Sequence, residues 1–393
     1  MQAIAVAWQI YGLTHRPLDL GFVGLAQFAP AILLFLVAGH AADRFPRKRI
    51  IAACYGSFSL CSLLLLALSL DGISSIWPIY AVLLLNGTVR AFNGPASSAF
   101  LPLLVDQEHF PNAVTWGSSI YQTANVLGPV AGGLIYGVAA SPVPVYCAAA
   151  VGGLVALLLV LRIRLKSSAI APRSASLSTF LEGFRYIWRH QVILGAISLD
   201  LFAVLLGGAV ALLPVYAREI LKIGAYGLGL LRSAPSLGAV LMAITVAHFP
   251  LRRQAGLIML VCVFCFGVLT VIFGISRNFV VSLAALVLLG SCDMISVIVR
   301  QTLVQISTPD EMRGRVSAVS GIFIGASNEL GGFESGVTAQ WFGTVPAVVL
   351  GGVGTMLIVA LWSWRFPALR RANRLVPERA IDPAAEAVET STQ

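Results

Sequence analysis

Apolar residues along the chain gather in long runs that are separated by short polar turns. Most runs approach 20 residues, the length that a helix needs to cross about 30 Å of hydrocarbon. The pattern therefore predicts an all-α integral membrane protein. We expect turns near 15–18, 43–49, 70–75, 106–111, 140–144, 164–190, 218–225, 249–254, 275–278, 307–313 and 342–346. The expected spans are 1–14, 19–42, 49–69, 76–98, 112–139, 143–163, 191–217, 225–248, 254–274, 279–305, 313–341 and 346–366.

The first span is the weakest of the set. A helix over 1–14 reaches only about 21 Å, short of the hydrocarbon thickness. No charged segment precedes it and no cleavage site follows, so it does not resemble a signal peptide. We expect that the chain begins inside a truncated first helix; the alternative is a short helix to which the bilayer adapts locally.

The longest polar stretch divides the chain into two halves. We predict an N-terminal six-helix bundle over 1–163, a cytoplasmic linker over 164–190, a C-terminal six-helix bundle over 191–366 and a disordered cytoplasmic tail over 367–393. Within the linker, apolar residues recur at helical spacing and predict an amphipathic helix on the cytoplasmic surface. These residues are Leu177, Phe180, Leu181, Phe184 and Ile187.

Three short sequences recur in the second half at a nearly constant offset. They are Phe45-Pro46-Arg47-Lys48-Arg49 with Phe249-Pro250-Leu251-Arg252-Arg253, Ala113-Val114 with Ala318-Val319, and Asn125-x-x-Gly128 with Asn328-x-x-Gly331. Together they indicate a duplicated six-helix unit, and hence two pseudo-symmetric bundles. Transporters that work by alternating access have this architecture, with substrate bound at mid-membrane between the halves.

Composition supports a membrane protein and accounts for the positive charge. The chain is 58% hydrophobic and 11% charged, whereas soluble domains carry about 25% charged residues. The net charge of +9 could suggest nucleic acid, but most of the basic residues fall in alternate turns and at the C-terminus. The other turns hold only Arg16, Arg218, Lys222 and Arg277. By the positive-inside rule the basic turns and the C-terminus are cytoplasmic, so no nucleic-acid partner is needed.

Cofactor and catalytic signatures do not emerge from the sequence. All six cysteines lie in apolar runs, and the pair Cys262-x-x-Cys265 has no second pair to complete a metal site. No phosphate-binding loop and no nucleophile–base arrangement is recognisable, which disfavours an enzyme. Active transport would then draw on an ion gradient or on partner subunits. We expect no metal or cofactor, a lipid bilayer, protons and a small molecule as partners, and a monomer.

Three motifs resemble the major facilitator superfamily. The stretch Gly39-His-Ala-Ala-Asp43-Arg44-Phe-Pro46-Arg47 is similar to its cytoplasmic loop signature, with Pro46 in place of a glycine. The resemblance implies that Asp43 pairs with helix ends and locks the closed cytoplasmic face, with Arg44 and Arg47 as partners. Arg90-Ala-Phe-Asn-Gly94-Pro95 is similar to its buried-arginine motif, and Gly128-Pro129-x-x-Gly132-Gly133 resembles its antiporter motif. The alternatives are a merely topogenic loop and ordinary small-residue packing.

Later stretches resemble the branch of this superfamily that contains enterobactin exporters and related efflux proteins. They surround Asp200, Arg232, Thr308–Val316 and Ser327–Gly336. The resemblance implies export of a small amphipathic molecule, siderophore-like or drug-like, across a bacterial inner membrane in exchange for protons. Uptake or facilitated exchange, and a non-transporting sensor or assembly protein, remain open because a fold does not determine a function.

Charged residues within the spans are the candidates for proton coupling, because a charge at mid-bilayer costs at least a few kcal/mol and needs a reason. Each can pair across helices, or bind a proton in one conformation and release it in the other. The candidates are Asp200, Glu329, Glu334, Asp293 and Arg90, whereas Arg232 and Arg300 are expected to be structural. Polar candidates for the substrate cavity are Gln9, Gln27, Asn93, Tyr121, Gln122, Asn125, Gln301 and Asn328, with Trp8, Tyr11 and Phe28 as aromatic neighbours.

Overall fold

A computed structural model of the chain describes residues 1–72, 75–163, 177–249 and 254–372. The described side chains exclude 35–36, 42–43, 107, 111, 177–180 and 310. The first half contains α1 (Gln2–Thr14), α2 (Pro17–Leu33), α3 (Phe35–Arg44), α4 (Arg47–Leu70), α5 (Trp77–Phe100), η1 (Leu101–Leu103), η2 (Gln107–His109), α6 (Phe110–Ala139) and α7 (Val143–Arg162). The second contains α8 (Leu177–Arg189), α9 (Gln191–Leu206), η3 (Ala209–Leu212), α10 (Leu213–Val215), η4 (Tyr216–Ile220), α11 (Gly224–His248), α12 (Ala255–Ile275), α13 (Phe279–Ile306), α14 (Asp310–Phe342), α15 (Thr344–Arg365) and α16 (Pro367–Arg370).

Each expected span corresponds to a helix or to a broken helix. In the described part of the chain, seven helical stretches are long and apolar enough to cross a membrane by themselves. The other expected spans are α1, α2 with α3, α5, α6 and α14, which are shorter or carry more polar residues. Of these less apolar elements, α1, α2, α6 and α14 contact the other bundle: α2 packs on α14, α6 packs on α11, and α1 touches α10 and α11.

Two spans that the sequence predicts as continuous are interrupted. The span over 19–42 breaks at Leu34, one turn after Pro30, whose ring removes an intrahelical hydrogen bond and weakens the helix near the break. The span over 191–217 breaks at Gly207 and Gly208, and continues as η3, α10 and the π-helix η4. Gly208 lies so close to the Gly331 carbonyl of α14 that a side chain would not fit. The break therefore allows α9 and α14 to approach closely.

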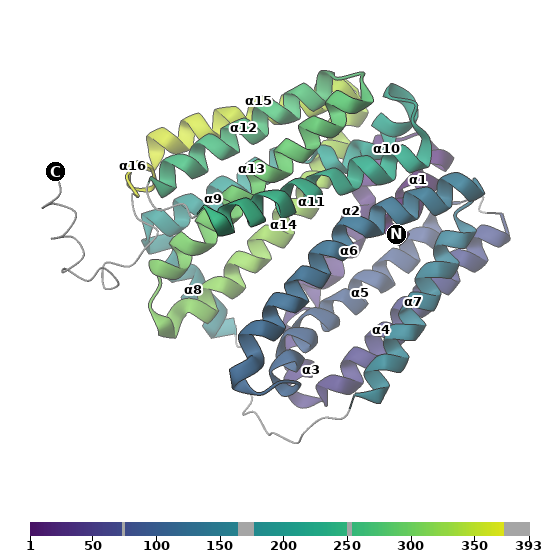
Figure 1. Ribbon diagram of the computed structural model, residues 1–393, viewed down its shortest axis with the longest axis horizontal. Helices are drawn as coiled ribbons and strands as arrows, with labels where there is room; N and C mark the ends of the chain where they lie inside the picture. The colour runs from purple at the N-terminus through teal and green to yellow at the C-terminus, as the bar shows by residue number, and fades with distance from the viewer. Residues whose placement is uncertain (73–74, 164–176, 250–253, 373–393) are drawn as a thin grey trace, which may run out of the picture.

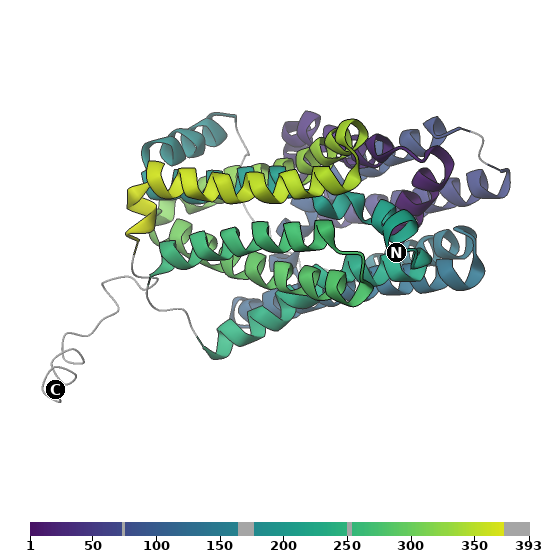
Figure 2. The same cartoon turned by 90° about the horizontal axis from the view of Figure 1, so that it is seen from above.

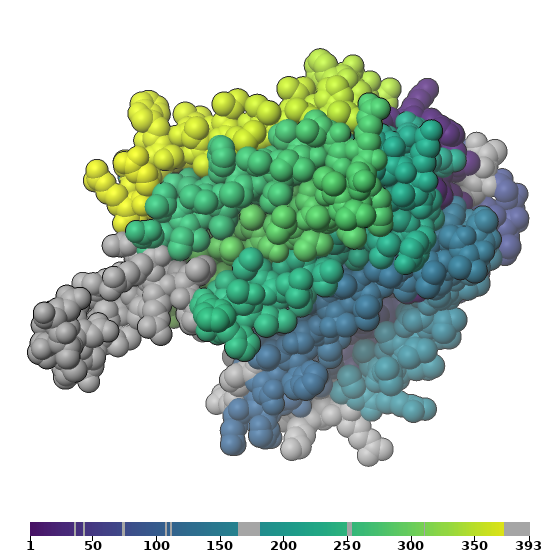
Figure 3. Space-filling model, turned by 45° about the horizontal axis from the view of Figure 1, so that its top comes forward, coloured from purple at the N-terminus to yellow at the C-terminus, as the bar shows by residue number. Residues whose placement is uncertain are grey.

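The two bundles lie side by side and are joined by two helix pairs. In Figure 1 the first half forms the purple-to-blue bundle and the second half the teal-to-yellow bundle. The pair α6 with α11 and the pair α2 with α14 make the main contacts between them. Figure 2 shows α12 and α15 running along the length of the second bundle, and Figure 3 shows the seam where α6 meets the second half.

The bundles converge at one end and diverge at the other. They diverge at the end that carries α3 and α8, which we call the basic end because the turns next to Arg47 and Arg189 lie there (Figure 1). We call the other end, which carries α1 and α10, the outer end. Close approaches join the halves between the middle and the outer end, as at Gly21 with Phe333 and at Gly133 with Gly229. The close approaches that join the halves therefore lie towards the outer end, and the backbones separate towards the basic end (Figure 1).

The amphipathic helix forms where it is predicted, and part of its apolar face packs on the second bundle while Leu181 and Trp188 stay exposed. Ile187 is buried in a cluster with Val316 and Val319 of α14, and Phe184 stacks on Phe323 with ring centroids 6.3 Å apart. Arg315 also pairs with Glu182, so α8 docks on α14 of the second bundle. In the predicted tail, α16 is helical and Leu369 is buried, which corrects the prediction of disorder at these residues; 373–393 lie outside the described residues.

Candidate functional site: the junction between the bundles

Glu329 is the acidic side chain at the centre of the junction. It projects from the middle of α14 towards α2, where its Oε2 atom lies 2.6 Å from the point that a Cβ at Gly24 would occupy. Arg90 of the first bundle and Arg232 of the second both interact with it electrostatically. One arginine from each half therefore contributes to the electrostatic environment of the carboxylate, and this environment depends on how the halves are arranged.

Arg90 connects this acid to a polar cavity in the first bundle. Its Nη1 donates a hydrogen bond to Gln27 Oε1 at 3.2 Å. Both side chains line a cavity of about 380 Å³ together with Asn93 and Asn86, whereas Phe58 and Leu83 supply apolar surface. The structure thus brings together three residues that the sequence suggests separately: Gln27, Arg90 and Asn93. A cavity with this mixed lining suits an amphipathic ligand.

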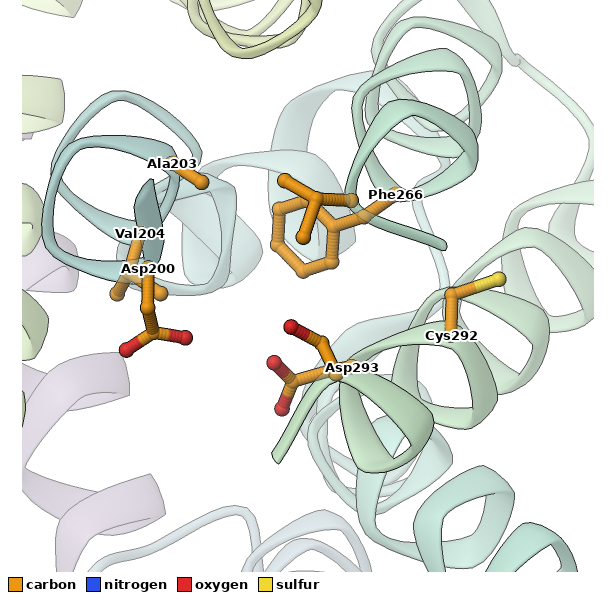
Figure 4. Close-up of a pocket in the computed structure, with 8 residues that line it drawn as sticks. Asp200, Ala203, Val204, Phe266, Cys292 and Asp293 are labelled. Atoms are coloured by element: carbon orange, nitrogen blue, oxygen red, sulfur yellow. The ribbon is translucent and has the colours of Figure 1, made fainter. Parts of the chain in front are cut away.

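A second group of charges lies inside the C-terminal bundle, between α9 and α13. Asp200 forms an ion pair with Arg300, and both are almost fully buried. Asp200 also lines a small pocket with Asp293 and Ser296, where the two carboxylates face each other across the space in Figure 4. Sequence alone gives Asp200 no basic neighbour within a helical turn; its partner comes from another helix.

The antiporter-like motif lies at a close contact between the halves, which Gly133 makes. A Cβ at Gly133 would lie 2.6 Å from the Ala225 carbonyl and 2.9 Å from the Gly229 Cα of α11. Gly229 in turn lies against the Pro129 carbonyl. Gly132 faces Met1, and Gly128 is also close to it. The motif therefore lets two helix backbones from different halves touch.

Replacing Gly133 by Val is expected to lower the thermal stability of the protein. The added carbons collide with backbone atoms of α11, and such overpacking costs about 1–3 kcal/mol. The measurement is thermal unfolding in detergent. Gly117→Val is the matched control, because Gly117 lies on the same helix with nothing within 4 Å of its added Cβ. Equal melting temperatures for the two variants would contradict the close contact.

At the outer end, α1 and η4 are joined by polar contacts that the sequence does not reveal. The Tyr11 hydroxyl donates to Glu219, and the Arg218 guanidinium lies 5.5 Å from the Trp8 ring centroid. Arg218 also lies against Gly12, where a Cβ would be 2.7 Å from its Nη1. Trp8 and Tyr11 thus join the halves at the outer end. Glu219 lies at an expected turn, so its position gives no sign of this contact.

Replacing Tyr11 by Phe is expected to loosen the outer end. The variant loses a hydrogen bond to a carboxylate, and such bonds contribute about 1.5–3 kcal/mol, so opening becomes about ten- to a hundredfold more frequent. Amide hydrogen exchange over η4 should rise accordingly, because these amides exchange when the contact opens. Tyr121→Phe is the control, since Tyr121 is exposed on α6. Unchanged amide hydrogen exchange over η4 in the Tyr11→Phe variant would show that the Tyr11–Glu219 hydrogen bond does not hold the outer end closed.

The remaining candidate residues lie apart from the central acid or bond locally. Gln9 points into the first bundle, where it bonds Ser69 and Tyr146. Glu334 accepts a hydrogen bond from Thr338 of its own helix at 2.6 Å. Asn328 bonds its own helix, and Gln301 and Tyr121 are exposed, whereas Gln122 and Asn125 are half-buried on α6. In the gating loop, Gly39 and Arg44 lie in α3 and Arg47 donates to Ala99; the Asp43 side chain lies outside the described residues.

Comparisons with known proteins agree with this architecture. A family model described as "Transmembrane secretion effector" matches residues 1–390. The enterobactin exporter EntS of Shigella boydii serotype 18 is 27% identical over 387 residues, which cover 95% of this chain and 90% of the exporter. EntS of Escherichia coli O157:H7 (strain EC4115 / EHEC) shows the same identity and coverage.

Solved structures share the fold at low sequence identity. A bacterial homologue of the human lysosomal transporter Spinster, in an inward-facing and occupied conformation, has a TM-score of 0.72 at 13% identity and covers 94% of each chain. The nucleoside transporter NupG has a TM-score of 0.67 at 15% identity and covers 94% of this chain and 96% of its own. These likenesses concern the fold alone. By its sequence and its two six-helix bundles, the chain is a multi-pass membrane transporter of the transmembrane secretion effector family, within the major facilitator superfamily.

Proposed function

We propose that the chain is a secondary active exporter and not an enzyme. It moves a small amphipathic molecule, siderophore-like or drug-like, out of the cytoplasm in exchange for protons. It acts as a monomer in a bacterial inner membrane, with the basic end and the C-terminus in the cytoplasm, and needs no cofactor. The related EntS proteins are enterobactin exporters, which supports export as the direction.

The observation that carries the proposal is the position of Glu329 at the contact of α14 with α2, where Arg90 of one half and Arg232 of the other both act on its charge. Alternating access moves the halves against each other, so it changes the distance from Glu329 to the arginine of the first bundle. A carboxylate that gains and loses a cationic neighbour can bind a proton in one conformation and release it in the other. Proton binding and the direction of opening are then linked through a single side chain.

The same arginine links the proton to the substrate. Arg90 bonds Gln27 in the lining of the 380 Å³ cavity, so a ligand that contacts Gln27 or Asn93 competes for its guanidinium. A bound ligand that draws Arg90 away from Glu329 favours protonation of the acid. Substrate and proton are therefore exchanged, because Arg90 interacts either with the bound ligand or with the ionised Glu329, and not with both. The apolar lining from Phe58 and Leu83 suits the hydrophobic part of such a molecule.

Transport in membrane vesicles tests this proposal. Inside-out vesicles with an acidic lumen are supplied with a siderophore, a macrolide or a cationic dye. An exporter that exchanges its substrate for protons accumulates a compound in the lumen, and an uncoupler abolishes the accumulation. Movement that is driven out of the lumen would instead indicate uptake. A chain that moves no compound and no protons in this panel would be a sensor or assembly protein.

A facilitated or inward transporter is the second candidate. The structural neighbour NupG is a nucleoside transporter by its description, and its fold matches this chain over nearly the whole length. The vesicle experiment separates the two candidates by the direction in which a proton gradient drives the compound.

A further inference from the structure

We propose that the pocket between α9 and α13 binds one sodium ion, with the carboxylates of Asp200 and Asp293 and the hydroxyl of Ser296 as ligands. This site lies inside the C-terminal bundle, whereas Glu329 lies at the junction between the bundles. The proposal concerns ion binding and does not depend on the substrate or on the direction of transport.

The pocket contains one negative charge, on Asp293, that no ion pair in the described part of the chain compensates. Asp200 is neutralised by its ion pair with Arg300, and both are buried. Asp293 lines the same pocket, and the structure records no ion pair for it among the described residues. A carboxylate in a low-dielectric interior needs a compensating charge. One monovalent cation brings the group to neutrality, whereas a divalent cation would overcompensate it.

Ser296 is the observation that indicates a ligand. It is only 2% exposed, it lines the pocket, and among the described residues its Oγ has no hydrogen-bond partner. Buried hydroxyls are nearly always satisfied, because an unsatisfied one costs about 1–3 kcal/mol. A cation in the pocket would give the Ser296 hydroxyl a partner, since hard cations prefer carboxylate and other oxygen donors.

The size of the pocket limits what it can hold. Its free volume is about 10 Å³, which is space for one water-sized sphere. Val263 and Phe266 supply apolar lining, and the oxygen atoms of Asp200, Asp293 and Ser296 supply the polar lining. A single small cation fits this volume, whereas a hydrated ion or an organic cation does not.

Sodium-dependent thermal unfolding of the full chain tests the proposal. The melting temperature is measured in detergent as sodium chloride replaces choline chloride at constant ionic strength, with potassium chloride for comparison. A ligand that binds only the folded state raises the melting temperature, here by about 2 °C or more at saturating sodium, and potassium should do less. Equal melting temperatures in sodium chloride and choline chloride would overturn the proposal. The pocket would then hold a water molecule, or Asp293 would be neutralised by a proton.

Two substitutions locate the ion. Asp293→Asn and Ser296→Ala should each raise the sodium concentration at half-effect by about tenfold or more, which corresponds to 1.4 kcal/mol or more. Ser296→Ala is the sharper test, because removing an unpartnered buried hydroxyl should not destabilise the sodium-free protein. The controls are Asp71→Asn and Ser119→Ala, both at exposed positions. An unchanged sodium response in Ser296→Ala would overturn the assignment, whatever the vesicle experiment gives.

Discussion

Replacement of Glu329 by Gln is expected to abolish proton-driven accumulation of substrate in inside-out vesicles. Glutamine has nearly the same shape as glutamate but cannot exchange a proton, so the gradient no longer drives the cycle. Movement of substrate down its own gradient should persist, and the accumulation ratio should fall from several-fold to about one, because coupling is lost while the cavity is kept. Uphill transport and its sensitivity to uncoupler are the quantities to measure.

Two matched variants make this result specific. Glu334→Gln changes the next acid on α14, which bonds Thr338 of the same helix, and Glu108→Gln changes an exposed acid in η2. Both should retain accumulation. If Glu329→Gln still accumulates substrate, the central acid is not the coupling group. If Glu334→Gln loses accumulation instead, the coupling acid lies one step further along α14.

Replacement of Asp200 by Asn is expected to destabilise the fold strongly. The variant leaves the Arg300 guanidinium buried without its ion-pair partner, and removing one member of a buried pair costs about 3–5 kcal/mol. Removing both members is much less costly, because no uncompensated charge then remains. The double variant Asp200→Asn with Arg300→Gln should therefore recover much of the lost stability in thermal or denaturant unfolding.

This comparison also separates a structural role of Asp200 from a role in proton coupling. The sequence favours proton exchange, since apolar residues flank Asp200 along its helix. If the pair is chiefly structural, stability and transport recover together in the double variant. A single variant that folds as stably as wild type but loses coupling would contradict the structural role. Asp71→Asn, at an exposed position, should change neither property.

The sequence predicts which segments are helical because a membrane helix must satisfy its backbone internally, so apolar run length determines the span. It does not predict where a span breaks when the cause lies on another helix. Gly208 illustrates this, since its need for close approach comes from Gly331 of α14. Glu329 was identifiable as an intramembrane charge, yet its two arginine neighbours come from α5 and α11.

The same limit applies to the smaller contacts. Gly133 could be recognised as a close-packing residue from the motif, whereas its partner Gly229 could not. Ser296 carries no signal at all, because serine is common in membrane helices and only its unpartnered hydroxyl distinguishes it. Gln9 has a polar side chain like that of a cavity residue, but it forms hydrogen bonds with Ser69 and Tyr146 inside one bundle. Side-chain direction is a property of the assembled bundle.

The glycine seam between α6 and α11 has a mechanical consequence. From Gly133 back to Phe110, α6 extends about 35 Å, since each residue adds 1.5 Å. A tilt of only about 10° about the seam therefore swings the far end of α6 through about 6 Å. Because the seam lies near one end of α6, any such tilt displaces the basic end of the helix much further than the outer end. The close packing of α6 on α11 at these glycines would therefore determine how far the two bundles separate at the basic end.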